Sequence, residues 1–138
     1  MTHQPADHFK LTSQGNPYAG EHLLVEFWGA RGLDNIDLIR DALESSATAA
    51  GATLLHSHYH HFGNGGGISG VSLLAESHIT IHTWPERRFA AIDIFMCGNC
   101  DPNDCLPTLM HVLCPEEIQT RTFRRGDSSA NGSIQKVA

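Results

Sequence analysis

Strict alternation of apolar and polar residues between positions 77 and 83 constrains the fold of this chain more than any other feature. One face of the run holds Ser77, Ile79 and Ile81, and the other holds His78, Thr80 and His82. A period of two is the pattern of a β-strand with one buried face. Residues 70–76 predict a preceding strand, and Trp84-Pro85-Glu86 ends the run. The fold must therefore contain a sheet that includes this segment.

Further strands are expected at 22–28, 52–62, 89–96 and 118–124, with a glycine turn at 63–67. One helix should begin after a cap at Asp34 or Asn35 and end at Gly51, and a second should span 104–112. Two helices are too few to cover both faces of the sheet. We therefore predict an α+β fold, a two-layer α/β sandwich with a mainly antiparallel sheet, whose open face favours a homodimer or a higher homo-oligomer.

Length and composition indicate one globular domain. The chain has 138 residues, of which 41% are hydrophobic and 17% charged. We expect a flexible N-terminal arm over 1–20, a folded domain over 21–126 and a disordered tail over 127–138. The sequence contains neither a long apolar run nor a secretion signal, which favours a cytoplasmic protein without a membrane partner. A formal net charge of −6 gives no support to nucleic-acid binding.

The histidines leave two interpretations open. Six of the ten lie between positions 56 and 82. His56, His58 and His60 alternate along one predicted strand, so their rings should project from one face about 7 Å apart. Together with His78 and His82 they could form a zinc or iron site. No carboxylate lies at ligand spacing, however, and hydrogen-bonded histidines in a sheet or an interface are the other interpretation.

The four cysteines, at positions 97, 100, 105 and 114, are interpreted as thiols. Cys97-Gly-Asn-Cys100 has the spacing of redox and zinc motifs, but it follows a strand instead of starting a helix. A thiolate there lacks the stabilisation of a helix N-terminus. A second Cys-x-x-Cys pair is absent from the sequence, which disfavours a structural zinc module.

The Glu76-Ser77 bond lies in the middle of the apolar, strand-like region. A serine hydroxyl can attack the carbonyl of its own preceding peptide bond and form an ester. β-Elimination then converts the serine to dehydroalanine, which hydrolyses to a pyruvoyl group. This ketone can form a Schiff base and act as an electron sink for decarboxylation. On the residues alone, His82, Ser69 and Cys97 are of suitable types to assist, although a serine between strands is usually structural.

Residues 74–86, Leu-Ala-Glu-Ser-His-Ile-Thr-Ile-His-Thr-Trp-Pro-Glu, closely resemble the processing-site signature of prokaryotic, pyruvoyl-dependent S-adenosylmethionine decarboxylase proenzymes. The resemblance continues through 51–56, 60–62, 69–71 and 90–98 and extends over the region 21–126. It implies an α/β sandwich with active sites at a homodimer interface. It also implies decarboxylation of S-adenosylmethionine to CO2 and decarboxylated S-adenosylmethionine, the aminopropyl donor for spermidine biosynthesis.

The resemblance also implies a role for each residue of the processing site. Ser77 is the residue converted to the pyruvoyl cofactor, with self-cleavage after Glu76. His82 matches the histidine that promotes β-elimination. Ser69 matches the serine whose hydroxyl supports processing. The expected products are the chains 1–76 and 77–138.

Three further residues match the catalytic and substrate-binding positions of the family. Cys97 matches the cysteine that gives a proton to the substrate carbon after CO2 leaves. Glu86 looks like the carboxylate that holds the ribose hydroxyls, and Phe62 is a candidate for stacking on adenine. The resemblance favours structural or pocket-lining roles for the histidines at 56, 58 and 60, so that we predict no metal.

The loop at 63–67 departs from the family pattern, because many members have a proline there and this chain has none. Of the properties that the resemblance implies, recognition of the adenosyl group is therefore the one that this sequence supports least. One alternative keeps Ser77, His82 and Cys97 and decarboxylates another amino acid, such as ornithine or arginine. A second alternative is an unprocessed, histidine-rich metal-binding domain.

Overall fold

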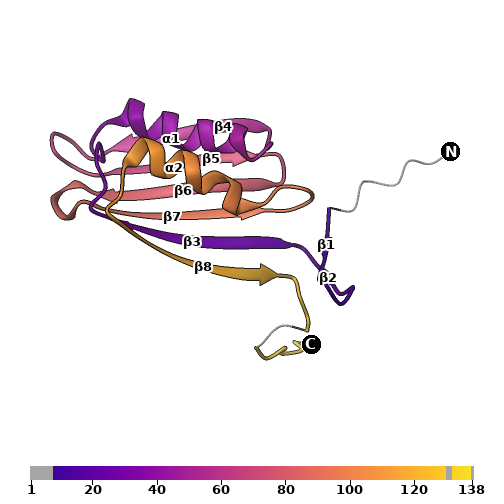
Figure 1. Cartoon of the computed structure of the whole chain (residues 1–138). Helices are drawn as coiled ribbons and strands as arrows, with labels where there is room; N and C mark the ends of the chain where they lie inside the picture. Colours follow the sequence, from indigo (N-terminus) through magenta and orange to yellow (C-terminus); the bar gives the residue numbers. More distant parts are fainter. Residues whose placement is uncertain (1–7, 130–131, 138) are drawn as a thin grey trace.

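A six-stranded antiparallel sheet with two helices on one face forms the body of the computed structural model, which describes residues 8–129 and 132–137 (Figure 1). The strand order is β4-β5-β6-β7-β3-β8. The strands are β3 (Gly20–Trp28), β4 (Leu54–His61), β5 (Ile68–Leu74), β6 (Ser77–Trp84), β7 (Phe89–Met96) and β8 (Glu117–Arg125). The predicted α+β class, two-layer architecture and antiparallel sheet are confirmed.

The main helix begins where the sequence predicts it. In α1 (Ile36–Ala49), the Asn35 side chain accepts hydrogen bonds from the amides of Asp37 and Leu38, each at 3.1 Å. These bonds satisfy two of the amides that lack a partner in the first turn. The second helix, α2 (Leu106–Leu113), follows the short 3-10 turn η2 (Pro102–Cys105). This second helix therefore begins slightly later than the sequence predicts.

Both helices pack on the face of the sheet that carries the apolar positions of β6. Ile79 and Ile81 are fully buried there, together with Leu23, Val25 and Phe27 of β3. The opposite face has no helix over it among the described residues, and the figure shows both helices on one side (Figure 1). His78, Thr80 and His82 lie on this open face, as the alternation predicts.

Strands β5 and β6 form a hairpin with a two-residue connection. Leu74 pairs with Ser77, so that only Ala75 and Glu76 lie in the turn. Glu76 has a φ of 60°, in the left-handed region. A residue with a Cβ loses about 1 kcal/mol in that conformation. The peptide bond between Glu76 and Ser77 therefore follows directly on a strained residue.

The segment predicted as a flexible arm contains regular structure that the sequence analysis missed. Strands β1 (Lys10–Leu11) and β2 (Pro17–Tyr18) form a small antiparallel hairpin, and Tyr18 is buried. A turn at Gly15, where φ is 85°, connects them. Residues 1–7 of the predicted arm, and residues 130, 131 and 138 of the predicted tail, lie outside the described residues. The described part of 127–138 has neither helix nor strand.

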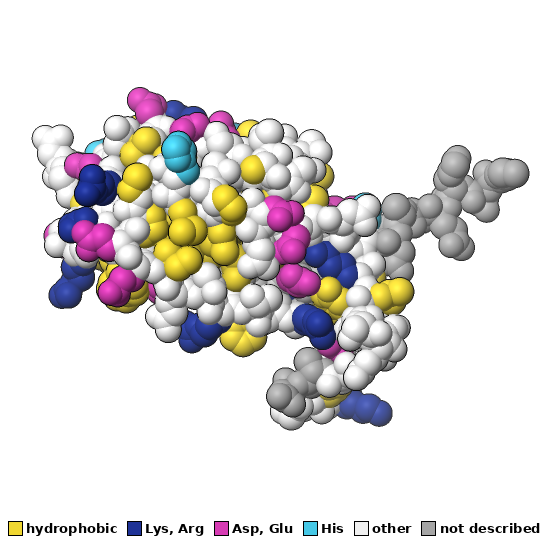
Figure 2. Space-filling model, viewed as in Figure 1, with side chains coloured by type: hydrophobic (Ala, Val, Ile, Leu, Met, Phe, Trp, Pro, Cys, Tyr) yellow, Lys and Arg dark blue, Asp and Glu magenta, His cyan; other side chains and the backbone are white. Residues whose placement is uncertain are grey.

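The surface agrees with the formal net charge of −6, which gives no support to nucleic-acid binding. On the face shown in Figure 2, basic side chains of the described residues are interspersed with acidic ones and form no continuous basic area. Neither described helix is long and apolar enough to span a membrane.

We expect Asn35→Ala to lower the free energy of unfolding by about 1 kcal/mol, because the first turn of α1 loses its side-chain acceptor. Asn35→Asp is the matched control, since a carboxylate accepts the same two bonds. Urea denaturation followed by circular dichroism measures both. Equal stability of the alanine and aspartate variants would show that the cap contributes nothing.

Candidate active site

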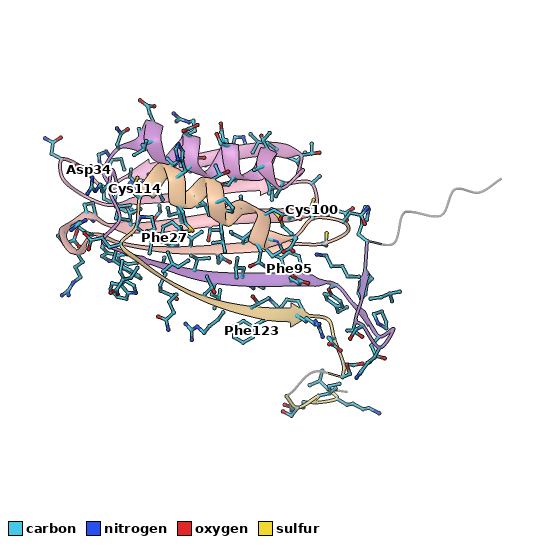
Figure 3. All side chains as sticks on the ribbon, viewed as in Figure 1. Phe27, Asp34, Phe95, Cys100, Cys114 and Phe123 are labelled. Atoms are coloured by element: carbon cyan, nitrogen blue, oxygen red, sulfur yellow. The ribbon has the colours of Figure 1, made fainter. Side chains whose placement is uncertain are left out.

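The strained turn places the Cys97 thiol against the Glu76-Ser77 bond. Cys97 directly follows β7, and its Sγ donates to the carbonyl oxygen of Glu76 at 3.0 Å. The Ser77 hydroxyl lies 4.0 Å from the same sulfur and is almost buried. A cavity of about 280 Å³ borders these residues and also includes Cys100. Figure 3 shows Cys100 at this end of the sheet and Cys114 at the other.

The surroundings of Cys97 favour the protonated thiol. Partial burial raises the pKa of the Cys97 thiol, and the nearby Glu76 carboxylate raises it further, while a hydrogen bond with Ser77 acts in the opposite direction. Since the net shift is upward, the group keeps its proton at neutral pH. A protonated thiol beside a carbonyl can donate a hydrogen bond and can later donate a proton.

A second group of predicted residues lies at the far end of β6. The Ser69 hydroxyl and Nδ1 of His82 are 2.9 Å apart, across the β5–β6 ladder. A shallow cavity of about 250 Å³ next to them is lined by His58 and His60 of β4. The ring of His82 is exposed. This end of the sheet therefore presents a histidine base with a hydroxyl partner.

Both predicted substrate-binding residues belong to this second group. Phe62 directly follows β4, is 65% exposed and contacts the ring of His60 at 4.5 Å between centroids. Glu86 is exposed in the 3-10 turn η1 (Pro85–Arg87), which directly follows β6. Neither side chain therefore lies near Ser77 in this chain.

The two groups cannot meet within one chain. Ser77 and His82 are five positions apart along an extended strand, a span of about 16 Å. They also point to opposite faces, Ser77 to the helix side and His82 to the open side. The structure thus brings together Glu76, Ser77 and Cys97 at one end of β6, and Phe62, Ser69, His82 and Glu86 at the other.

The structure also contains a polar cluster that the sequence analysis missed. Oδ2 of Asp93 lies 2.5 Å from Nε2 of His22 and 3.2 Å from Nε2 of His78, and Oδ1 accepts a bond from Thr80. Burial alone would raise the pKa of Asp93, but the bonds from His78 and His22 outweigh it and lower the pKa. These residues share one face of adjacent strands. That relation can be recognised only once the strand order is known.

His22, His78 and Asp93 are the only described group close enough to hold a metal ion, with ligand atoms within 4.8 Å of one another. Arg125, however, lies 3.4 Å from Nδ1 of His22 and can only donate. The proton of a neutral His22 then lies on Nε2 and points at Asp93. This arrangement favours hydrogen bonding over metal ligation.

Among the described residues, the other candidate metal and redox residues form no group close enough to hold a metal ion. His56, His58 and His60 alternate along β4 as predicted, and all three are exposed. All four cysteines are free thiols. Cys105 is fully buried and Cys114 is exposed, so that one is a core thiol and the other a surface thiol.

The fold and the site describe an α+β protein with a serine at a strained hairpin turn beside a protonated thiol. Residues 21–126 match the family model described as S-adenosylmethionine decarboxylase. A relative from Methanococcus maripaludis (strain C5), named S-adenosylmethionine decarboxylase proenzyme, is 42% identical over 110 residues, covering 78% of this chain and 89% of the relative. A protein of the same name from Thermomicrobium roseum is 34% identical over 108 residues, covering 78% and 93%.

Solved structures agree with the sequence comparisons. The crystal structure of the adenosylmethionine decarboxylase from Aquifex aeolicus matches with a TM-score of 0.72 and 32% identity, covering 85% of this chain and 98% of that one. The chain belongs to the S-adenosylmethionine decarboxylase family. It is therefore a member of a family of decarboxylase enzymes.

We expect the thiols to react with iodoacetamide in the order Cys114, Cys97, Cys105 at pH 7.5. Cys114 is exposed, Cys97 is partly buried with a raised pKa, and burial raises the pKa of Cys105 to about 12. Only the thiolate reacts, so modification of Cys97 should accelerate as the pH rises toward 9. Peptide mass spectrometry over time measures each site. A Cys97 rate that is independent of pH would contradict the raised pKa.

Proposed function

We propose that this chain cleaves itself between Glu76 and Ser77 and uses the resulting pyruvoyl group to decarboxylate S-adenosylmethionine. The observation that supports this most is the 3.0 Å contact from the Cys97 thiol to the carbonyl oxygen of Glu76, the carbonyl of the bond to be cut. The products are CO2 and decarboxylated S-adenosylmethionine, the aminopropyl donor for spermidine.

The processing step follows from the groups around the turn. Oγ of Ser77 attacks the carbonyl carbon of Glu76, the C–N bond breaks, and an ester replaces the amide. The Cys97 thiol donates to the carbonyl oxygen as negative charge develops there. A base then removes the Cα proton of residue 77, and the carboxylate of residue 76 leaves. Hydrolysis of the dehydroalanine releases ammonia and leaves the pyruvoyl group.

The residues at the Ser77 end of β6 fit a pyruvoyl group and its use in decarboxylation. The pyruvoyl group supplies a carbonyl electrophile that accepts the electron pair released with CO2. Residue 77 borders the cavity that also contains Cys97, and this cavity is open enough to admit a substrate amine. After CO2 leaves, the Cys97 thiol donates its proton to the substrate carbon.

The processing base has to come from a second copy of the chain. His82 and Ser69 lie at the far end of β6, on the face opposite Ser77. The open face is only partly polar, and Trp28, Trp84, Val71, Leu73 and Phe123 are exposed apolar residues of its strands. A homodimer with open faces in contact and β6 strands antiparallel brings His82 of one protomer over the Glu76-Ser77 turn of the other. Each active site is then composite.

In the proposed dimer, Glu86 and Phe62 also come from the second copy of the chain, together with His82 and Ser69. An exposed carboxylate can bind the two ribose hydroxyls, and an exposed aromatic ring can stack on adenine. Their position at the same end of β6 as His82 supports a nucleoside substrate over a small amino acid, because ornithine and arginine offer neither a ribose nor a base.

Ser77→Ala should abolish cleavage, because no hydroxyl is left to attack. A denaturing gel should show one full-length band instead of two, and intact mass spectrometry should find no pyruvoyl mass change. Release of labelled CO2 from S-adenosylmethionine should also disappear. Ser57→Ala, which removes a hydroxyl from β4, is the control and should be cleaved normally.

The same assays test the function as a whole. Cleaved wild-type protein that releases CO2 from ornithine or arginine and not from S-adenosylmethionine would overturn the substrate. A wild-type chain that remains intact and holds stoichiometric metal would overturn the enzyme and favour the histidine-rich metal-binding alternative.

Mixed dimers test the composite site. Neither Ser77→Ala nor His82→Ala should be cleaved alone. Co-expression of the two variants with different tags should restore cleavage of the His82→Ala chain, because its Glu76-Ser77 turn then lies opposite His82 of the partner. The Ser77→Ala chain should stay intact. If no cleaved chain forms in a mixture shown to contain mixed dimers, the two groups do not act across protomers.

A further inference from the structure

Cleavage after Glu76 changes how residue 77 is held. In the intact chain the two-residue turn connects it to β5. Once the bond is cut, residue 77 is the first residue of a strand. The register pairs Ser77 with Leu74 of β5 alone, whereas His78 pairs with both Leu73 and Phe95. The pyruvoyl group therefore lies one residue beyond the doubly paired part of β6, where strand ends fray.

The Asp93 carboxylate holds β6 close to this end. Oδ2 accepts from His78 at 3.2 Å, and Oδ1 accepts from Thr80, two residues further along the same strand. Both bonds lie on the face opposite Ser77. These two bonds connect the part of β6 that lies near the turn to β7 through side chains. They add to the backbone hydrogen bonds between the two strands.

Asp93 is itself held in place. Nε2 of His22 on β3 lies 2.5 Å from Oδ2, and Arg125 on β8 contacts the other nitrogen of that ring. The carboxylate is partly buried, with a quarter of its side chain exposed. Charge-assisted bonds in such a site are stronger than bonds in open water. The cluster is therefore a clamp that joins β6, β7 and β3.

The clamp lies on the same strand as the proton donor. Asp93 lies within β7, and Cys97, four positions further along the chain, directly follows that strand. The distance from residue 77 to the Cys97 sulfur, 4.0 Å in the intact chain, depends on how β6 lies against β7 at this end. A clamp between these two strands limits changes in that distance.

We propose that Asp93 is a positioning residue that keeps the pyruvoyl-bearing end of β6 next to Cys97 after self-cleavage, by clamping His78 and Thr80. The inference rests on the proposed cleavage at Glu76-Ser77. It goes beyond it, because it assigns a role to a cluster to which the proposed cleavage and decarboxylation assign none. Before cleavage, the turn holds residue 77 and the clamp matters less.

The test compares Asp93→Asn with Glu26→Gln, in the cleaved protein and in the uncleavable Ser77→Ala background. Glu26 is a carboxylate of the same face whose ion-pair partner is Arg121 of β8 instead of a residue of β6. Hydrogen exchange of the amides 78–81 is measured by mass spectrometry, together with kcat and KM. His22→Ala, which frees Asp93 from β3 and leaves the bonds to β6, is the milder variant if Asp93→Asn does not fold.

Asp93→Asn should be cleaved to completion, and its amides 78–81 should exchange about tenfold faster than those of the cleaved wild type. Its kcat should fall about tenfold, with KM changed less than about twofold. In the Ser77→Ala background, the same substitution should change exchange less than about threefold. Glu26→Gln should match the wild type throughout, and His22→Ala should lie between.

Two results overturn the inference while leaving the proposed function intact. One is unchanged exchange and unchanged kcat in cleaved Asp93→Asn. The other is equal acceleration of exchange in the cleaved and uncleaved backgrounds, which would give Asp93 a purely structural role. A wild-type chain that is never cleaved overturns the proposed function first, and the inference with it.

Discussion

The pairing of β6 between β5 and β7 is the constraint on which the rest of the structure depends. Leu74 opposite Ser77 leaves room for only two residues in the turn, and this forces Glu76 into the left-handed region. The β6–β7 register then places the residue that follows β7, Cys97, beside the carbonyl of Glu76. A slip of one residue would exchange the two faces of β6 and bury the histidines in place of the isoleucines. The hydrophobic core on the helix side therefore also determines the geometry of the reactive turn.

The same alternation explains why one chain contains only part of the proposed active site. A strand delivers its side chains to two faces and along a length of about 3.3 Å per residue, so Ser77 and His82 cannot converge. In the proposed dimer, a two-fold axis between two open faces resolves this, because each copy then offers its turn to the histidine of the other. The partial exposure of Trp28 and Trp84 on that face fits a surface that a second copy covers. In the proposed enzyme, dimerisation thus comes before self-cleavage.

Much of the fold could be predicted from local patterns. Alternation predicted β6 and β7 nearly to the residue, and the cap expected at Asp34 or Asn35 predicted the start of α1. The N-terminal hairpin was missed, because its strands are two residues long and contain a proline, too short for a periodic signal. The clamp around Asp93 was missed for a different reason. Its members come from three strands that are neighbours only in the order β6-β7-β3, which no local pattern contains.

The site residues, like the fold, could be predicted only in part from local patterns. Composition and spacing could indicate a serine, a histidine and a cysteine suited to the chemistry, but they could not separate the residues that share one end of β6 from those that share the other. The environment of Cys97 links the two proposed steps. Burial and the neighbouring Glu76 carboxylate keep the thiol protonated, so it can donate to the carbonyl oxygen before cleavage. The proposed cleavage removes that carbonyl from the chain that begins at residue 77. In the proposed mechanism, the thiol proton is then available to the substrate carbon, so that the same group serves both processing and turnover.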